Sequence, residues 1–198
     1  NGSLPEKMPI VSDASPATRY VEDRTETWNL RTTDGPFWEI LDFGFLEGGP
    51  FTDEDERSGN RVAVINEAAR RAFFGDRPAL NGFIELDGQR YRVVGVVRNV
   101  DPLRAEAAAD VYAPHSTRKS QDFRRFYFSG SFSALLLARS RADFPRIKAE
   151  FRSRTEMAKT QESFEKILGM PMTRIEQFAN AMQIEPTSEP PTRMLIWQ

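Results

Sequence analysis

His115 is the side chain in this sequence best suited to acid–base chemistry, and it is the single histidine. One histidine cannot build a multi-histidine metal site. The absence of cysteine excludes disulfides, thiolate zinc sites, iron–sulfur clusters and cysteine nucleophiles. His115 follows a short apolar run and a proline, with no acid–nucleophile pattern nearby. We therefore predict a surface histidine in a loop, in preference to a catalytic base.

Two other segments contain residue types that occur in functional sites. The acidic run Asp53–Glu56 lacks the alternating spacing and the distant glutamate of a calcium loop, so a solvated turn is predicted. Ser129-Gly130-Ser131 lacks the strand-to-helix turn that exposes a hydrolase serine, and the sequence has no glycine-rich phosphate loop. We therefore predict a non-enzymatic chain with no catalytic, cofactor-binding or metal-ligating residue.

Residues 116–129 mix basic and aromatic side chains: Arg118, Lys119, Phe123, Arg124, Arg125, Phe126, Tyr127 and Phe128. A nucleic-acid stacking surface is disfavoured because the rest of the chain supplies no matching basic face. Arginine beside aromatic rings is the composition that protein interfaces favour, which makes this segment a candidate contact surface. The alternative is that Phe126 and Phe128 point into the core and leave only the arginines outside. Both interpretations stay open.

The composition is typical of a water-soluble globular domain. The 198 residues include 27 Lys and Arg against 29 Asp and Glu, a net charge of −2, with 39% hydrophobic residues. The 15 Phe, 4 Tyr and 3 Trp supply enough apolar area for a core, which excludes disorder over the whole chain. The near-neutral net charge argues against a protein that binds a nucleic-acid backbone through its overall positive charge. The longest apolar runs are far shorter than the roughly 20 residues that span a bilayer.

The elements that position these residues begin with an irregular or edge-like segment, because three prolines interrupt the first 17 residues. Residues 18–32 mix β-branched and aromatic residues with charges, which predicts one exposed strand. Asp34 is expected to cap a short helix that has Pro36 in its first turn. A strand at Phe43–Leu46 is expected to follow.

The middle of the chain has the strongest local signals. Arg61–Ile65 predicts a buried strand, and Asn66 is expected to cap a helix that ends at Gly75. Asp87-Gly88 is the residue pair that a tight two-residue hairpin turn prefers. Three further strands are predicted here: Phe83–Leu86, Arg90–Val97 and Val111–Ala113.

The last third is predicted to be mostly helical. After a strand at Phe132–Ala138, Asp143 and Pro145 are expected to start a helix, and Thr173 with Glu176 forms a possible capping box for another. Weaker signals predict a helical turn at Ser163–Leu168 and a strand at Met194–Trp197. Mixed strands and helices around a hairpin-rich middle predict an α+β fold.

The succession of elements over residues 36–113 resembles a known family. The segments that carry the resemblance are Pro36–Leu41, Phe45–Thr52, Arg61–Gly75, Tyr91–Val97 and Val111–Pro114. No single segment is decisive, and the specificity lies in their order. This order is similar to that of the periplasmic core domain of MacB-like (FtsX-like) ABC transporter permeases.

The resemblance implies a two-part fold and a location. A discontinuous α/β porter-like subdomain is expected at residues 1–44 and 131–198, with an inserted β-rich subdomain at residues 45–130. The chain is expected to be the periplasmic domain of an inner-membrane permease, between its first and second membrane helices. The full gene is then expected to encode one such helix before Asn1 and three after the domain.

The function that the resemblance implies is the coupling of membrane-helix motion to a substrate or periplasmic partner in export. The implied partners are a cytoplasmic ATPase subunit or domain and a periplasmic adaptor or lipoprotein, in a dimeric, membrane-embedded full-length protein. No nucleic acid and no cofactor is expected. An extracytoplasmic sensor or ligand-binding domain with a closed apolar cavity is the alternative. A small hydrolase using Ser129 or His115 is the enzymatic rival, and it needs His115 bonded to a nucleophile in a deep pocket.

Overall fold

The computed structural model describes residues 9–120, 132–162 and 171–181. The predicted turn at Ser163–Leu168 and the predicted strand at Met194–Trp197 lie outside these ranges. Each helix within these ranges is too short or too polar to span a bilayer.

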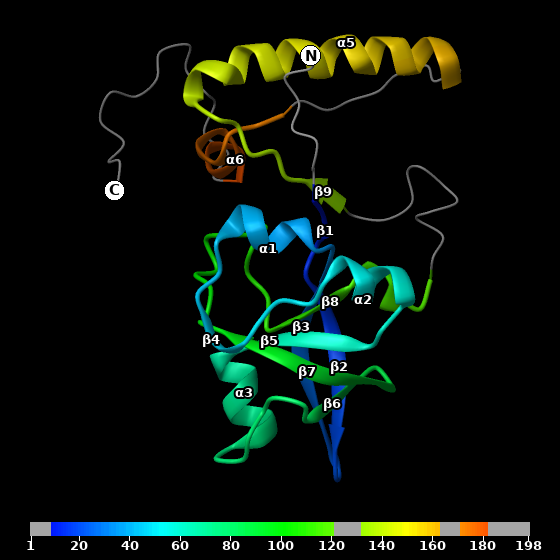
Figure 1. Ribbon diagram of the computed structural model, residues 1–198, viewed down its shortest axis with the longest axis vertical. Coiled ribbons are helices and arrows are strands. Elements are labelled where there is room, and N and C mark those ends of the chain that lie inside the picture. The colour runs from blue at the N-terminus through cyan, green and yellow to red at the C-terminus, as the bar shows by residue number, and fades with distance from the viewer. Residues whose placement is uncertain (1–8, 121–131, 163–170, 182–198) are drawn as a thin grey trace. The chain divides into compact units, whose positions relative to one another are not determined.

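The chain divides into two compact units (Figure 1). The larger unit, Glu6–Leu137, contains all of the described strands, and the smaller one combines Asn1–Pro5 with Ala138–Gln198. The smaller unit contains the helices α5 (Phe144–Glu162) and α6 (Arg174–Ala181). Strands together with helices confirm the predicted α+β class.

Nine described strands form one mixed sheet in the larger unit. They are β1 (Ile10–Ser12), β2 (Ser15–Val21), β3 (Arg24–Thr33), β4 (Phe45–Gly48), β5 (Val62–Asn66), β6 (Phe83–Leu86), β7 (Gln89–Val97), β8 (Val111–Pro114) and β9 (Phe132–Ala134). Four strands in the order β3-β8-β5-β7 make the centre, with β3–β8 and β5–β7 parallel and β5–β8 antiparallel. β3 and β7 are the outer strands of this centre, and each pairs with two further strands. β3 pairs with β1 and β2, and β7 pairs with β4 and β6.

The predicted subdomain boundary between residues 44 and 45 lies inside this sheet. β3 precedes the boundary and β8 follows it, yet the two strands pair in parallel from Leu30 with Val111 to Thr33 with Pro114. The compact units therefore divide the chain at other positions than the expected subdomains. The assignment of a porter-like and an inserted subdomain stays a prediction.

The β5–α3 connection forms as the sequence predicts. β5 is buried along its whole length, and the side chain of Asn66 accepts a hydrogen bond from the backbone N–H of Ala69 at the start of α3 (Glu67–Phe74). Gly75 ends the helix with a φ of +57°, a value that glycine adopts without a steric penalty. Phe73 and Phe74 of α3 are buried against one face of the sheet.

The hairpin between β6 and β7 also confirms its prediction. Leu86 pairs with Gln89 across a two-residue turn, in which Asp87 has a φ of +51° and Gly88 a φ of +71°. Positive φ at both central positions is the geometry of the primed turn that matches the twist of a hairpin. The turn reaches a distant strand as well, because Asp87 Oδ1 accepts from the Thr18 N–H at 2.8 Å and the Asp87 N–H donates to the Thr18 carbonyl at 2.8 Å.

These two hydrogen bonds bring together the two ends of a curled sheet. β2 and β6 are the outer strands of the series β2-β3-β8-β5-β7-β6, and they lie in contact. The strand directions make β2 and β6 antiparallel to each other. The six strands thus curl into a barrel-like sheet joined at Thr18 and Asp87.

Buried side chains form one apolar cluster on each face of the sheet. The first cluster packs α3 on the inner face of the curled strands, with Ile65, Tyr91 and Val93 among its members. The second packs α1 (Pro36–Leu41) through Phe37 and Trp38 against Val64 and Tyr112. Edge-to-face ring contacts such as Trp38–Tyr112, at 5.3 Å between centroids, add to this packing.

Two local predictions in the first third need correction. Residues 18–32 form a hairpin of β2 and β3, with the turn at Glu22 and Asp23, and not one strand. Gly35, and not Asp34, is the N-cap of α1, and the Asp34 carboxylate accepts a hydrogen bond from the Ile10 N–H at 3.0 Å. At the start of the chain, where an irregular or edge-like segment was predicted, the strands β1 and β2 begin at Ile10 and Ser15.

The predicted strand at Phe132–Ala138 is also shorter than expected. β9 ends at Ala134, because it pairs only with the three residues of β1. In the smaller unit, a 3₁₀ turn at Arg141–Asp143 leads directly into α5, near the predicted helix start. The predicted capping box is confirmed, since the Thr173 N–H donates to Glu176 Oε2 at 2.7 Å and the Glu176 N–H donates to Thr173 Oγ1 at 3.2 Å.

Candidate functional site

His115 is a buried core residue, which corrects the prediction of a surface histidine. It lies in a 3₁₀ turn (His115–Thr117) after β8, with a side chain only 5% exposed. Its Nδ1 lies 2.9 Å from Thr32 Oγ1, and its Nε2 lies 2.8 Å from the carbonyl oxygen of Ile10. Both partners are distant in sequence, so the local pattern around His115 contained no sign of burial.

The His115–Thr32 pair does not make a hydrolytic site. A catalytic histidine needs a nucleophile that a substrate can reach, and Thr32 is only 4% exposed. The second imidazole nitrogen lies against a backbone carbonyl, where a catalytic triad has an orienting carboxylate. The pair therefore connects β1, β3 and the turn after β8. Ser129, the other residue of the hydrolase hypothesis, lies outside the described residues.

The basic and aromatic segment at residues 116–129 is described only as far as residue 120. Its first residues are anchored: Ser116 donates from its N–H and hydroxyl to Glu56 Oε2, and Thr117 accepts from Gln89. Arg118 donates to Thr32 Oγ1 at 3.1 Å and lies over the Phe132 ring at 5.1 Å, and partial burial lowers its pKa. Of the two basic residues described here, only Lys119 is exposed.

The other residues proposed for this contact surface lie outside the described ranges. They are Phe123, Arg124, Arg125, Phe126, Tyr127 and Phe128. The choice between a contact surface and core aromatics therefore stays open.

Arg31 is a buried basic residue that the sequence analysis did not single out. Its guanidinium donates to backbone carbonyls of Ser12 and Ala105, and burial lowers its pKa. Tyr112 binds the same loop, with its hydroxyl donating to the Ala107 carbonyl at 2.7 Å. These side chains hold the β7–β8 loop against the sheet. Nothing in the local sequence distinguishes a structural arginine of this kind from an exposed one.

The acidic run forms the first turn of α2 (Asp53–Ser58) and not a loop. Thr52 and Asp55 make a reciprocal capping box, in which the Thr52 N–H donates to Asp55 Oδ2 at 2.9 Å. These bonds lower the pKa of Asp55 below its usual value, although its partial burial acts in the opposite direction. Carboxylates in the first helical turn also favour the positive end of the helix dipole. No group of three or more metal-ligating side chains occurs among the described residues.

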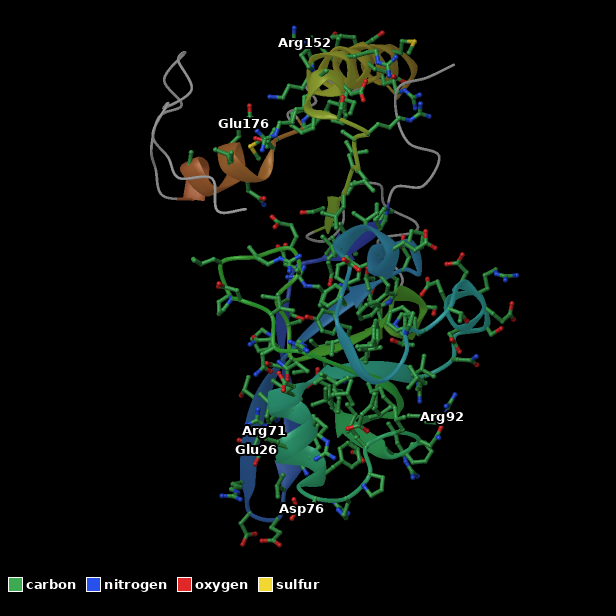
Figure 2. The ribbon with its side chains drawn as sticks, turned by 60° about the vertical axis from the view of Figure 1, so that its left-hand side comes forward. Glu26, Arg71, Asp76, Arg92, Arg152 and Glu176 are labelled. Carbon is green, nitrogen blue, oxygen red and sulfur yellow. The ribbon has the colours of Figure 1, made fainter. Side chains whose placement is uncertain are left out.

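A groove of about 260 Å³ lies where β2 and β6 face each other beside α3. The side chain of Arg19 crosses the groove with its guanidinium 4.6 Å from the centre of the Phe73 ring. Arg90 stacks over Phe83 in the same way, at 3.9 Å. Tyr20 and Phe83 are 72% and 51% exposed, so the groove opens to solvent between two exposed aromatic rings. Arg92 projects at the surface of the neighbouring strand β7 (Figure 2).

A family model of the MacB-like periplasmic core domain matches residues 3–166. The chain belongs to this family. The resemblance read from the order of elements is thereby confirmed. As a MacB-like core domain, the chain is the periplasmic domain of an ABC transporter permease, on the extracytoplasmic side of the membrane.

Curated relatives match this MacB-like domain over about half of its length. The macrolide export ATP-binding/permease protein MacB of Wolinella succinogenes is 33% identical over 97 residues, which cover 49% of this chain and 14% of that protein. The ABC transporter permease YknZ of Bacillus subtilis is 28% identical over 102 residues, covering 52% of this chain and 25% of the relative. The chain thus spans no more than a quarter of the length of these two relatives.

Solved structures show the same fold as this MacB-like domain. The periplasmic region of MacB from Actinobacillus actinomycetemcomitans superposes with a TM-score of 0.62 at 19% identity, covering 96% of this chain and 80% of that one. The extracellular domain of the transporter YknZ from Gram-positive bacteria superposes with a TM-score of 0.60 at 18% identity, covering 86% and 82%. At these identities the likeness shows the fold.

Proposed function

We propose that this domain is non-catalytic and couples movement of membrane helices to a substrate or a periplasmic partner during export. The observation that carries the proposal is the family match over residues 3–166. A domain with this task needs rigid units with a movable junction, and a reactive cleft is not required. The division of the chain into two compact units at Leu137 and Ala138 supports this reading.

The buried polar side chains also support a structural assignment. His115 and Arg31 bind backbone carbonyls of segments that are distant in the sequence, and Tyr112 binds the loop that precedes its own strand. Such bonds stiffen the larger unit, because breaking one would leave a buried polar group without a partner. A stiff unit transmits a displacement without absorbing it.

The partners of the full-length protein follow from the same proposal. A cytoplasmic ATPase, either fused or separate, supplies the energy of ATP hydrolysis, because the name of the MacB relative combines ATP-binding and permease functions. A periplasmic adaptor or lipoprotein receives the movement, and the full-length protein is a dimer. The porter-like subdomain (residues 1–44 and 131–198) and the inserted subdomain (residues 45–130) belong to this proposal.

The absence of cysteine allows a direct test of the coupling. Spin labels can be attached at Leu103→Cys in the larger unit and at Met157→Cys in the smaller one. The side chains of Leu103 and Met157 are 74% and 57% exposed. In the full-length transporter, with any other cysteines replaced, we expect the distance distribution between the labels to differ between nucleotide-free and ATP-bound states. The control pair Arg24→Cys with Leu103→Cys lies within the larger unit, and its distribution should stay constant. An unchanged distribution for both pairs would contradict the coupling.

A further inference from the structure

The strands β1 and β9 form a two-stranded ribbon that lies next to both chain connections between the compact units. The units divide at Pro5–Glu6 and at Leu137–Ala138, β1 is the first described strand after the first division, and β9 is the last before the second. We call Ile10–Ser12 together with Phe132–Ala134 the ribbon (Figure 1). A displacement that passes along the covalent chain from one unit to the other therefore reaches the sheet through the ribbon.

The two strands of the ribbon are paired along their whole length. Every residue of β1 has an antiparallel partner in β9. The Leu135 N–H also donates to the Pro9 carbonyl at 3.0 Å, which extends the ladder beyond the two strands. Because hydrogen-bonded pairs alternate along an antiparallel ladder, the next such pair is Val11 with Ser133. Val11 thus directs its own N–H and carbonyl at β9.

The ladder between the ribbon and the rest of the sheet is much shorter. β1 pairs with β3 at one register position, Val11 with Thr33, whereas β2 pairs with β3 at seven. Asp13 and Ala14 separate β1 from β2 and belong to neither strand. β1 can therefore leave β3 while the β2–β3 hairpin stays paired.

Side chains supply further hydrogen bonds to the backbone of Ile10. Its N–H donates to Asp34 Oδ2 at 3.0 Å. Its carbonyl accepts from Thr33 Oγ1 at 3.1 Å and from His115 Nε2 at 2.8 Å. Three side chains thus hold one residue at the start of β1.

Ser12 at the other end of β1 is held in a similar way. Its hydroxyl oxygen accepts from the Thr32 N–H at 2.9 Å, and its carbonyl accepts from the guanidinium of Arg31. Water can replace a side-chain partner without the loss of neighbouring ladder bonds. The boundary between β1 and β3 is accordingly a place of low local stability within the sheet.

Few apolar contacts anchor the ribbon. The side chain of Val11 is fully buried in the second cluster, against which Leu135 packs. The Phe132 ring lies 5.6 Å from the ring of His115 and 5.1 Å from the guanidinium of Arg118. Separation from β3 exposes one fully buried apolar side chain, that of Val11, whereas every residue of the central strand β5 is buried.

We propose that the ribbon is the movable junction of this domain, and that it separates from β3 while β1 and β9 stay paired. In the attached state Ile10 and Ser12 are bound by the side chains described above, and in the released state water binds these groups and Val11 is exposed. Tension on either chain connection favours release, because it acts on the ribbon. The role of release in export rests on the proposed function, whereas release itself is a property of this chain.

Amide hydrogen exchange of the 198-residue chain, followed by NMR, tests the release directly. The Thr32 N–H points at β1, and because directions alternate along a strand, the Arg31 N–H points at β8. Release exposes only the first of these two amides. We expect the protection factor of Thr32 to be at least about tenfold lower than those of Arg31 and of Val11, whose N–H stays bound to β9.

A matched pair of variants tests the attachment by side chains. Thr33→Val removes the hydroxyl that binds the Ile10 carbonyl, and it should lower the protection of the Thr32 amide roughly two- to tenfold. Thr117→Val removes an equally buried hydroxyl, which donates to the Pro114 carbonyl at 2.7 Å outside the ribbon. This control should leave the protection of Thr32 unchanged, because the Thr117 bond persists in the released state.

Cysteine pairs follow the ribbon in the full-length transporter, with any other cysteines replaced. Val11→Cys with Thr33→Cys joins the ribbon to β3, and the control Ile10→Cys with Ala134→Cys joins β1 to β9. Both are antiparallel pairs of the type that is not hydrogen-bonded, with Cα atoms about 4.5 Å apart, which suits a disulfide. Under mild oxidation the yield of the first disulfide should differ between nucleotide-free and ATP-bound states, and that of the control should not. Alkylation of the remaining thiols and mass spectrometry measure the yields.

Three exchange results would overturn the release. They are equal protection of Thr32 and Arg31, a Val11 amide as poorly protected as Thr32, and equal effects of Thr33→Val and Thr117→Val on the Thr32 amide.

The cross-linking separates this inference from the proposed function. If the labels at Leu103 and Met157 change their distance with nucleotide but the first cysteine pair reacts equally in both states, the ribbon is not the junction and the coupling stands. If the label distances stay constant, the coupling is contradicted, and the exchange results for the chain alone still decide whether the ribbon separates from β3.

Discussion

Thr32 Oγ1 binds two side chains that are distant from it in the sequence. The hydroxyl oxygen accepts from Arg118 Nη1 at 3.1 Å and lies 2.9 Å from Nδ1 of His115. Because a carbonyl oxygen can only accept, Nε2 of His115 carries the hydrogen that is donated to the Ile10 carbonyl at 2.8 Å. One hydroxyl group of β3 thus contacts two residues of the segment that follows β8.

Removal of this hydroxyl should destabilise the larger unit. Thr32→Val conserves the shape but removes the hydroxyl that contacts His115 Nδ1 and Arg118 Nη1, at a cost of about 1–3 kcal/mol in the free energy of unfolding. Urea denaturation, followed by tryptophan fluorescence, measures the change. The exposed Thr27 of the same strand provides the control, and Thr27→Val should change stability by less than about 0.5 kcal/mol. Equal effects of the two substitutions would contradict the role of Thr32.

Asp34 gives the stability a defined dependence on pH. Burial raises the pKa of its carboxyl, and the charge of Glu56 adds to this shift. The folded chain therefore holds the Asp34 proton at pH values where the unfolded chain has lost it. The contribution of Asp34 to stability is most favourable below the unfolded pKa, about 3.9, and falls as the pH rises to the raised folded value.

Asp34→Asn removes this contribution while keeping an acceptor for the Ile10 N–H. We expect the free energy of unfolding of the variant, relative to that of the wild type, to be larger at pH 7 than at an acidic pH below the unfolded pKa, which means that the variant is relatively more stable at pH 7. Urea denaturation at the two pH values gives this difference. Asp76→Asn, at an exposed carboxylate beyond α3 (Figure 2), is the matched control. The same pH dependence in both variants would contradict the assignment to Asp34.

At the level of the elements, structural features that depend on residues close in the sequence could be predicted, and pairings between distant residues could not. The Asn66 cap, the Asp87-Gly88 turn and the Thr173–Glu176 box depend on residues within a few positions of one another. The β2–β3 hairpin was missed because Glu22-Asp23 is not a turn-favouring pair. The burial of His115 was missed because its partners are 83 and 105 positions away.

Variants of Asp87 separate its two contributions to the β6–β7 turn, which are the positive φ of its backbone and the hydrogen bond that its side chain accepts from Thr18. Asp87→Asn keeps both the preference for positive φ and an acceptor for the Thr18 N–H, so its stability should be close to that of the wild type. Asp87→Gly keeps the backbone conformation and loses the acceptor. Asp87→Ala loses both and should be less stable than Asp87→Gly by about 1–2 kcal/mol, the cost of a left-handed residue with a Cβ. Chemical denaturation of the three variants ranks them, and equal stability of the Gly and Ala variants would contradict the turn geometry.

At the level of the whole molecule, burial is distributed unequally between the two compact units. Both apolar clusters lie within Glu6–Leu137. Ile147 is the one buried side chain among those that the structure describes in the smaller unit, at residues 138–157, 171–173, 175–177 and 179. The partly exposed ion pair Lys148–Glu176, at 2.6 Å between Nζ and Oε1, lies close enough to solvent to contribute little to the stability of the helices that it joins. The larger unit should therefore be the more stable one.

We accordingly expect unfolding in two steps. Trp28 and Trp38 report on the larger unit once Trp197→Phe has removed the tryptophan of the smaller one, while α5 and α6 contribute strongly to far-UV circular dichroism. In a denaturant titration the circular dichroism should begin to change at a lower concentration than the fluorescence. Coincident transitions would show that the two units unfold as one.

The contact between Thr18 and Asp87 also has a consequence for the lifetime of the folded state. These residues are 69 positions apart, whereas the hairpins that contain them each form from near neighbours. Joining the two hairpins requires the closure of a long loop, so we expect this contact to form after the main barrier to folding. An interaction made after the barrier slows unfolding and leaves the folding rate unchanged. Asp87→Gly should then raise the unfolding rate, and it should change neither the folding rate nor the slopes of the two chevron limbs. The contact is in that case a source of kinetic stability.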